Sequence, residues 1–274
     1  MIRIGIGSWT WPWAVGFSRN PYTYPKINAM DLIDLAASND IHLVQLYNNI
    51  DLLSIDISDL REIRLRADQY TIDLEIGGMG IEDNYLQDLL SVADLLGSRR
   101  VRTVITPPDS DRSRYDVDTV VAIIRNSISE FENTGRSLLI ENHDRYTSSE
   151  YREIVERVNS EALGICFDSA NSLGKIEHFR DSFRVLRDFV YSCHYKEYSI
   201  KRVETNLGFI IQGCCPGQGE NISNEFFGLI QSLGKDMDVV LEQWVPFQGT
   251  VEDTLRTERL WADRGIQILK SYST

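Results

Sequence analysis

Residues 190–198 read VYSCHYKEY, and this stretch combines a strand with chemistry at its end. Its first half is apolar and favours a strand, and His194, Lys196 and Glu197 then follow within four positions. Because side chains alternate along a strand, His194 and Lys196 point to the same side. An imidazole is a common metal ligand, and a lysine can orient or protonate an oxygen. The alternative is a strand end with a solvated charge pair, so the neighbouring strands must decide between the two interpretations.

Seven more short apolar runs along the chain predict strands, and a segment with helical periodicity follows each of the eight. The predicted strands span residues 2–7, 41–47, 71–76, 101–105, 137–140, 163–167, 189–194 and 237–241. The predicted helices span residues 30–37, 58–70, 84–96, 117–133, 149–158, 177–186, 223–233 and 250–269. Strands that alternate with helices pair in parallel, and eight such units in 274 residues predict a closed (β/α)8 TIM barrel of the α/β class.

We expect residues 1–274 to form a single domain, because no linker or low-complexity tract divides them. An open doubly wound sheet is the alternative fold, but GIGSWTW at residues 5–11 lacks the third glycine of a dinucleotide-binding turn. The long connection after the seventh strand predicts a hairpin insertion at about 199–213, with TNLG at its turn. This hairpin would lie over the active-site mouth, where it would close the mouth or contact another subunit.

The composition excludes several classes of protein. The formal net charge of −13 argues against a nucleic-acid partner, which a basic face would bind. No apolar run is long enough to span a membrane, and the first residues do not form a signal peptide. The four cysteines show no CxxC spacing, which favours a reducing compartment. We therefore expect a cytoplasmic protein that binds neither nucleic acid nor membrane.

A polar residue ends each of the last four predicted strands: Glu141, Asp168, His194 and Glu242. Neighbouring parallel strands lie about 4.8 Å apart, so these side chains can meet at the barrel mouth. Three carboxylates packed together repel one another, and a divalent cation would resolve that conflict. Oxygen ligands with one imidazole suit manganese, magnesium or cobalt, and zinc is also compatible. Helix capping or loop hydrogen bonds would explain any one of these residues, but four on successive strands favour a metal site.

The sequence resembles the xylose-isomerase-like TIM-barrel superfamily, which includes sugar phosphate isomerases and epimerases. The resemblance covers nearly the whole chain. It is carried by IENH at 140–143, GICFDSAN at 164–171, CHYKEY at 193–198, GQGE at 217–220 and VVLEQW at 239–244. The set and its order are typical of the superfamily and say little about the substrate.

This resemblance implies one divalent metal held by Glu141, Asp168, His194 and Glu242. In epimerase-like members the two glutamates, here Glu141 and Glu242, also face each other across the substrate as acid and base. The family often has aspartate where this chain has Glu197, which leaves the role of Glu197 open. The resemblance also implies that an arginine after the seventh strand touches the substrate, and Arg202 is the candidate.

The predicted chemistry is proton transfer next to a carbonyl. The metal would bind the carbonyl and an adjacent hydroxyl of an open-chain keto-sugar or sugar acid and lower the cost of an enediolate. One glutamate would remove a proton and the other would return one. Lys196 and His143 would stabilise the oxygens or relay protons, with a solvated loop position as the alternative for both.

Four further residues are predicted substrate contacts. Trp9 lies in an aromatic loop after the first strand and could form a wall of a sugar site, or a lid over the core. Asn48 and Glu75 are close to the ends of the second and third strands and could bind hydroxyls. Arg202 completes the set. Cys166 shares the side of Asp168 and is expected to fill the barrel.

Three functions remain open on these residues. The first is a metal-dependent isomerase or epimerase of a small carbohydrate. The second is a metal-dependent lyase, a decarboxylase or dehydratase of a keto-sugar acid, which needs the same metal and only one proton donor. The third is a non-catalytic sugar-binding or scaffold protein. Self-association is left open as well.

Overall fold

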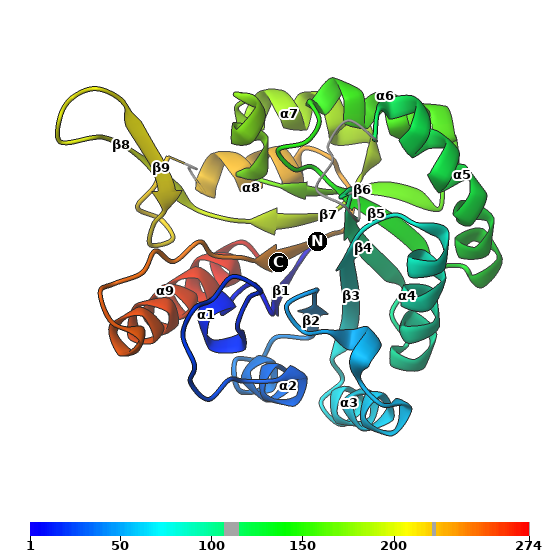
Figure 1. Cartoon of the computed structure of the whole chain (residues 1–274), viewed down its shortest axis with the longest axis horizontal. Coiled ribbons are helices and arrows are strands. Elements are labelled where there is room, and N and C mark those ends of the chain that lie inside the picture. The colour runs from blue at the N-terminus through cyan, green and yellow to red at the C-terminus, as the bar shows by residue number, and fades with distance from the viewer. Residues whose placement is uncertain (107–114, 221–222, 274) are drawn as a thin grey trace.

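The computed structural model describes residues 1–106, 115–220 and 223–273. Eight parallel strands close into a barrel in the order β1-β10-β7-β6-β5-β4-β3-β2, and the predicted (β/α)8 TIM barrel is confirmed (Figure 1). The barrel strands are β1 (Ile2–Gly7), β2 (Leu43–Leu46), β3 (Asp73–Met79), β4 (Arg100–Val104), β5 (Ser137–Glu141), β6 (Leu163–Asp168), β7 (Val190–Tyr195) and β10 (Met237–Leu241). The single-domain extent over residues 1–274 stays a prediction.

Helices surround the barrel because each has one apolar stripe that packs against the strands. They are α1 (Pro12–Val15), α2 (Ala29–Ser38), α3 (Ile57–Gln69), α4 (Asp83–Leu96), α5 (Val117–Thr134), α6 (Ser148–Val158), α7 (Phe179–Leu186), α8 (Ser223–Gln231) and α9 (Val251–Tyr272). Short 3-10 turns lie at Leu52–Ser54, Asn171–Lys175 and Arg187–Phe189. None of the helices in the described part of the chain is long and apolar enough to cross a membrane.

Two predicted helix caps are displaced in the structure. Residue 58 was expected to cap its helix, yet α3 begins after Asp56. Ser148 was expected to cap the helix α6, but Thr147 is the capping residue. The Thr147 side chain accepts a hydrogen bond from the amide of Glu150, and the Glu150 carboxylate accepts one from the amide of Thr147. This reciprocal pair gives two backbone amides at the start of the helix a hydrogen-bond acceptor. With Ser148 as the cap, Glu150 would not stand three residues after the cap and could not complete the pair.

Strand β3 is longer than predicted and runs through Gly77 and Gly78 to Met79. Glycines normally indicate a turn, but here they permit close packing inside the barrel wall. A Cβ at Gly77 would lie 2.5 Å from the ring of Tyr47, and one at Gly78 would lie 2.2 Å from the hydroxyl of Tyr85. As a consequence Glu75 lies in mid-strand rather than at the strand end.

The predicted hairpin is present as β8 (Tyr198–Arg202) and β9 (Phe209–Gly213), which pair antiparallel. In Figure 1 it extends away from the barrel, beyond the ring of helices. Its base is fixed at Gly213, where a Cβ would lie 1.9 Å from the carbonyl oxygen of Trp244. The hairpin therefore joins the body of the protein next to the loop that follows β10.

Candidate metal centre

The four predicted metal ligands converge at the carboxyl ends of their strands. Each of the four side chains is buried and offers one ligand atom, and these atoms all lie within 4.8 Å of one another. The residues are Glu141, Asp168, His194 and Glu242. The Nδ1 atom of His194 lies 3.2 Å from Glu242 Oε1, 3.7 Å from Glu141 Oε2 and 3.7 Å from Asp168 Oδ2. Two ligands that hold one metal at about 2.1 Å are roughly 3 to 3.5 Å apart. The spacing therefore fits a shared divalent ion.

Strand register and local hydrogen bonds place Asp168. In the barrel, Asp168 is the direct neighbour of His194 across β6 and β7. Its Oδ1 accepts from the backbone amides of Ala170 and Asn171, at 2.8 and 2.9 Å. The side chain of Asn142 accepts from the Asp168 amide and donates to its carbonyl. One carboxylate oxygen is thus used locally, and Oδ2 is directed into the cluster.

The imidazole of His194 is oriented by Cys166, whose Sγ lies 3.3 Å from Nε2. A proton on Nε2 can be donated to sulfur, a weak acceptor, so the Nδ1 lone pair faces the carboxylates. Burial would lower the pKa of His194, but Cys166 and Glu242 raise it well above its ordinary value. A metal ion that bound Nδ1 would therefore have to displace a proton. Cys166 fills the barrel, as the sequence indicated, and also contacts a ligand.

Two buried cations share the carboxylate cluster, and one of them, Arg102 on β4, was not predicted. Its guanidinium lies 2.9 Å from Glu141 Oε2 and 2.7 Å from Glu242 Oε1, and its Cζ lies 3.3 Å from the ring centroid of Tyr47. Lys196 Nζ lies 2.9 Å from Asp168 Oδ2 and 2.9 Å from Glu242 Oε2. Alternation along RVRTV at residues 100–104 was the only sequence signal that an arginine points inward.

These cations change the protonation of the cluster. Burial alone would raise the pKa of Glu141, but Arg102 and then His194 lower it to about 2. Burial would likewise raise the pKa of Asp168, yet Lys196 holds it below its usual range. The pKa of Lys196 is raised, because Asp168 and Glu242 outweigh its desolvation. Three carboxylates and two permanent cations therefore face one another, leaving a net charge of −1 when His194 is neutral.

The residues present fit a divalent ion on an independent ground. Glu141 Oε2, Asp168 Oδ2 and His194 Nδ1 are buried and have no hydrogen-bond partner in the described part of the chain, although ion-pair contacts surround them. His194 Nδ1 faces only carboxylate oxygens among these contacts, and a buried nitrogen in that position needs either a proton or a metal ion. All three belong to the side chains predicted to hold the metal, and all three face the same point.

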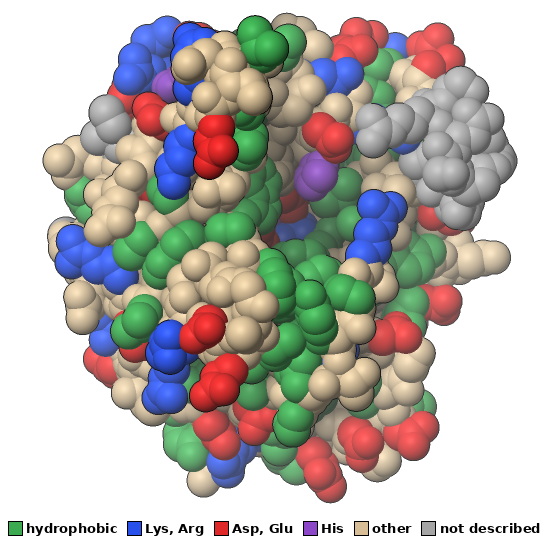
Figure 2. All heavy atoms as spheres, turned by 60° about the vertical axis from the view of Figure 1, so that its left-hand side comes forward, with side chains coloured by type: hydrophobic (Ala, Val, Ile, Leu, Met, Phe, Trp, Pro, Cys, Tyr) green, Lys and Arg blue, Asp and Glu red, His purple; other side chains and the backbone are tan. Residues whose placement is uncertain are grey.

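A small cavity opens above the cluster. It has a volume of about 130 Å³. Its lining comprises Trp9, Tyr47, Met79, Arg102, Val104, Glu141, His143, Lys196, Glu242 and Trp244. Figure 2 shows a depression rimmed by hydrophobic side chains with charged side chains deep inside it. The cavity thus combines apolar walls with a charged floor, as sites for small polar ligands do.

Two predicted substrate residues line this cavity, and a third contacts one of them. Trp9 forms part of the wall and donates from Nε1 to Asn48 Oδ1 at 3.3 Å, which places Asn48 at the exposed rim. His143 lies on the wall with its side chain 38% exposed, and its Nδ1 lies 2.6 Å from Asp144 Oδ1. These positions suit contacts with a ligand in the cavity.

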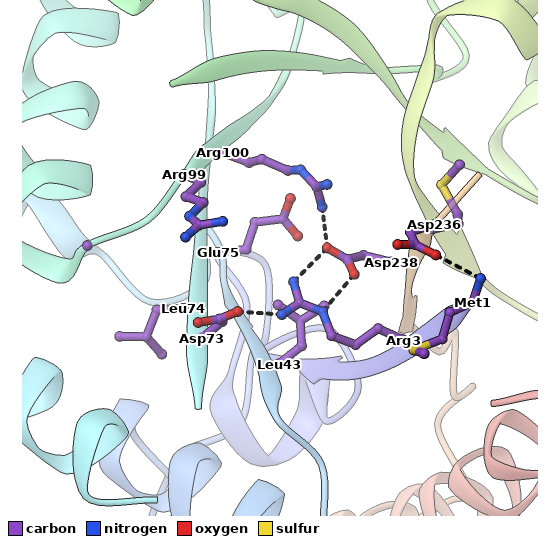
Figure 3. A pocket seen from close by; sticks show the side chains of 12 residues that line it. Met1, Arg3, Leu43, Asp73, Leu74, Glu75, Arg99, Arg100, Asp236 and Asp238 are labelled. Atoms are coloured by element: carbon purple, nitrogen blue, oxygen red, sulfur yellow. Dashed lines mark hydrogen bonds and ion pairs between the residues drawn. The ribbon is translucent and has the colours of Figure 1, made fainter. Parts of the chain in front are cut away.

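Glu75 and Arg202 lie outside the lining of the mouth cavity. Glu75 lines a second cavity, of about 390 Å³, at the amino-terminal ends of the strands (Figure 3). Its Oε2 accepts from Gln45 at 3.2 Å, and burial raises its pKa. Arg202 lies on the exposed part of the hairpin and donates to the carbonyl of Asn206.

Glu197 is buried but does not belong to the ligand cluster. Its Oε2 accepts from the hydroxyl of Tyr195 at 2.5 Å and from the amide of Gly217 at 3.0 Å. It therefore fastens the connection that returns from the hairpin. Glu197 lies two residues beyond the end of β7 and accepts hydrogen bonds away from the cluster, so it separates from His194.

Comparison with known proteins gives the family. Residues 82–272 match the xylose isomerase-like TIM barrel family, and the chain belongs to it. The motif-based resemblance is therefore confirmed.

The relatives described below are distant in sequence, but each covers 98% or 99% of this chain. The 3-oxo-isoapionate decarboxylase of Pectobacterium atrosepticum is 24% identical over 268 residues, which cover 98% of this chain and 95% of the relative. The D-psicose 3-epimerase of Clostridium cellulolyticum H10, solved with D-tagatose, has a TM-score of 0.74 at 15% identity and 98% coverage of both chains. A xylose isomerase-like TIM barrel protein of Mycobacterium smegmatis, solved with magnesium, has a TM-score of 0.66 at 13% identity, with 99% of this chain and 97% of that chain covered. The relatives with a named activity are enzymes, in agreement with the predicted enzymatic role.

Proposed function

We propose that the chain is a divalent-metal-dependent isomerase or epimerase of a small keto-sugar or sugar acid. The observation that carries this proposal is the convergence of His194 Nδ1 and three carboxylate oxygens beneath the mouth cavity. Glu141, Asp168, His194 and Glu242 would hold manganese, magnesium or cobalt, with zinc also compatible. When bound, the ion would supply Lewis acidity that polarises a substrate carbonyl and favours an enediolate.

The side chains around the cavity would divide the remaining work. Glu141 and Glu242 would act as base and acid on the carbon next to the carbonyl. Arg102 contacts both glutamates and would keep them in fixed orientations. Lys196, kept protonated by its carboxylate neighbours, would donate to a substrate oxygen. The indole rings of Trp9 and Trp244 would pack against the carbon skeleton and exclude water.

A second candidate is a lyase that removes CO2 from a keto-sugar acid, and the charge of the cavity favours it. Arg102 and Lys196 reduce the charge of the three carboxylates to −1, so a divalent ion would make the centre +1 and favour an anionic substrate. The bond to the carboxylate would break, its electrons would pass to the ketone as an enediolate, and Lys196 could return a proton to carbon. The full-length similarity to a decarboxylase supports this alternative.

The test is metal analysis followed by a substrate screen. Metal-free protein would be titrated with Mg²⁺, Mn²⁺, Co²⁺ and Zn²⁺, and each form assayed on ketoses and keto-sugar acids. A product of unchanged mass and altered stereochemistry supports the isomerase, and loss of CO2 supports the lyase. A ligand that binds without any metal-dependent turnover would favour a sugar-binding protein and contradict both enzymes.

The acid–base role has its own test in Glu242→Gln, measured on the identified substrate. We expect turnover to fall by about 10²–10⁴-fold, because the amide cannot exchange the proton. Exchange of the substrate α-hydrogen with solvent should fall in parallel. Glu156→Gln on the exposed side of α6 is the matched control and should leave both unchanged. Full turnover of Glu242→Gln would sink the assignment.

A further inference from the structure

The hairpin of β8 and β9 exposes an apolar face that the described barrel does not cover. Ile200 pairs with Ile211 across the two strands, and Arg202 pairs with Phe209, so these side chains share one face. Ile200 is 42%, Ile211 47% and Phe209 62% exposed. Leu207, in the turn, is 89% exposed. We call Ile200, Leu207, Phe209 and Ile211 the hairpin patch.

The barrel supports only the base of this hairpin. Tyr198, Ser199 and Gly213 are buried, and the residues beyond them become exposed. Within the described part of the chain, β8 and β9 pair only with each other. A two-stranded hairpin is at best marginally stable alone in water, and its open edges invite further pairing. A contiguous apolar surface of this kind marks an interaction site.

Charge indicates what the patch contacts. The whole chain carries a net charge of −13, so two copies repel each other over most of their surfaces. Residues 198–213 carry Lys201 and Arg202 against a single acid, Glu204. The Arg202 guanidinium lies 4.5 Å from the centroid of the Phe209 ring, so it borders the apolar face. The hairpin is therefore a place where two acidic copies can approach without strong repulsion.

We propose that the hairpin patch is the surface through which two copies of this chain associate. The two hairpins pack face to face about a two-fold axis, so that the patch of one copy covers the same patch of the other. Arg202, which shares this face with the patch, then reduces the negative charge where the two copies meet. This inference does not depend on the proposed reaction, since it uses no residue of the metal centre.

The test is sedimentation velocity of the full chain over a range of concentrations. We expect a reversible dimer, and we expect Ile211→Asp to weaken dimerisation at least about 30-fold, the effect of losing one central interface residue. Leu65→Asp makes the same change at an apolar residue on α3 that is 67% exposed, and it should leave the dimer intact. Added salt should tighten the wild-type dimer, because it screens the repulsion between acidic copies.

Three results would overturn the proposal: a wild-type chain that stays monomeric at every concentration, a dimer that survives Ile211→Asp, or equal weakening by Leu65→Asp. Hydrogen exchange of the wild-type chain keeps the proposal testable if Ile211→Asp fails to fold. Amides of residues 198–213 should then become more protected as the protein concentration rises. Unchanged protection in a chain that dimerises would place the interface elsewhere.

Discussion

Arg102 is the side chain that allows three carboxylates to share one buried site. Its guanidinium stacks on Tyr47 and bridges Glu141, which ends the adjacent strand β5, and Glu242, which follows β10 across the barrel. Lys196 does the same for Asp168 and Glu242. A buried ion pair is costly to form, but removing one partner is costlier, because a buried charge is left without compensation.

Replacing Arg102 with leucine should therefore make the fold depend on metal. Without metal, we expect the free energy of unfolding to fall by about 3–5 kcal/mol, because Glu141 and Glu242 lose their cation. Saturating Mn²⁺ should restore much of this loss, since the ion takes over the compensation of charge. Urea unfolding with and without metal measures both quantities.

Arg66→Leu is the matched control for this change. Arg66 also holds a carboxylate, that of Asp34, through two contacts of 2.8 Å, but on the surface. Surface ion pairs add little to stability, so this variant should lose little and lose it equally with and without metal. An Arg102→Leu loss that metal does not reduce would contradict the role given to Arg102.

The convergence of the four candidate ligands could be predicted from the sequence, whereas the contacts of Arg102 and Cys166 could not. Glu141, Asp168, His194 and Glu242 each follow an apolar run, and parallel strands align their carboxyl ends. Arg102 comes from a strand on another part of the barrel, and only closure of the sheet brings it to Glu242. Sequence patterns give the side on which a residue points, but they do not give the depth it reaches.

At the scale of elements, α9 fastens α1 to the end of the barrel through one buried carboxylate. Glu258 on α9 is fully buried, and it accepts from the amides of Trp13 at 2.6 Å and Ala14 at 2.9 Å. The indole of Trp13 donates to the carbonyl of Val245 in the loop after β10. This junction supports the aromatic loop that carries Trp9. The sequence indicated neither the short helix α1 nor this contact, because Glu258 lies 245 residues from Trp13.

The charge on Glu258 should make stability fall as pH rises. Burial raises its pKa from 4.5 to about 8, against the opposing effect of the two amides. The folded state thus binds a proton that the unfolded state releases, so this contribution is complete below the unfolded pKa and is lost as pH rises through the folded pKa. Between about pH 6 and about pH 9 we expect a loss of up to about 3 kcal/mol.

Glu258→Gln separates this effect from the hydrogen bonds. The amide oxygen can still accept from one of the backbone amides, but the side chain cannot ionise. The variant should show a flatter dependence of its urea midpoint on pH and become the more stable protein at the alkaline end. Parallel pH curves for the two proteins would show that Glu258 does not titrate in this range.

At the scale of the whole molecule, the two ends of the barrel have different roles. The carboxyl ends of the strands carry the ligand cluster and its cavity. The amino-terminal end carries an ion-pair network in which Arg3 and Arg100 both contact Asp238, and Arg3 also contacts Asp73 (Figure 3). The alternation of strands and helices was enough to predict the barrel, because each unit is local. The network joins β1, β3, β4 and β10. These strands come together only when the barrel closes, so a local sequence pattern cannot predict which of their residues form ion pairs.

The network at the amino-terminal end should support stability without influencing the metal. Asp238 is buried, and Arg3 donates to it from Nε at 2.7 Å and from Nη2 at 2.8 Å. Asp238→Ala leaves two guanidinium groups without their shared carboxylate, and we expect a loss of about 2–3 kcal/mol, less than for a fully buried pair because Arg3 is partly exposed. The affinity for Mn²⁺ should stay unchanged, since stability and chemistry lie at opposite faces of such barrels. Asp236→Ala is the control, because its side chain is 91% exposed and pairs with the terminal amine on the surface, and it should change neither quantity. Urea unfolding and calorimetric metal titration on the same samples measure the two quantities. Weaker metal binding by Asp238→Ala, in a fold that keeps its stability, would contradict this separation of roles.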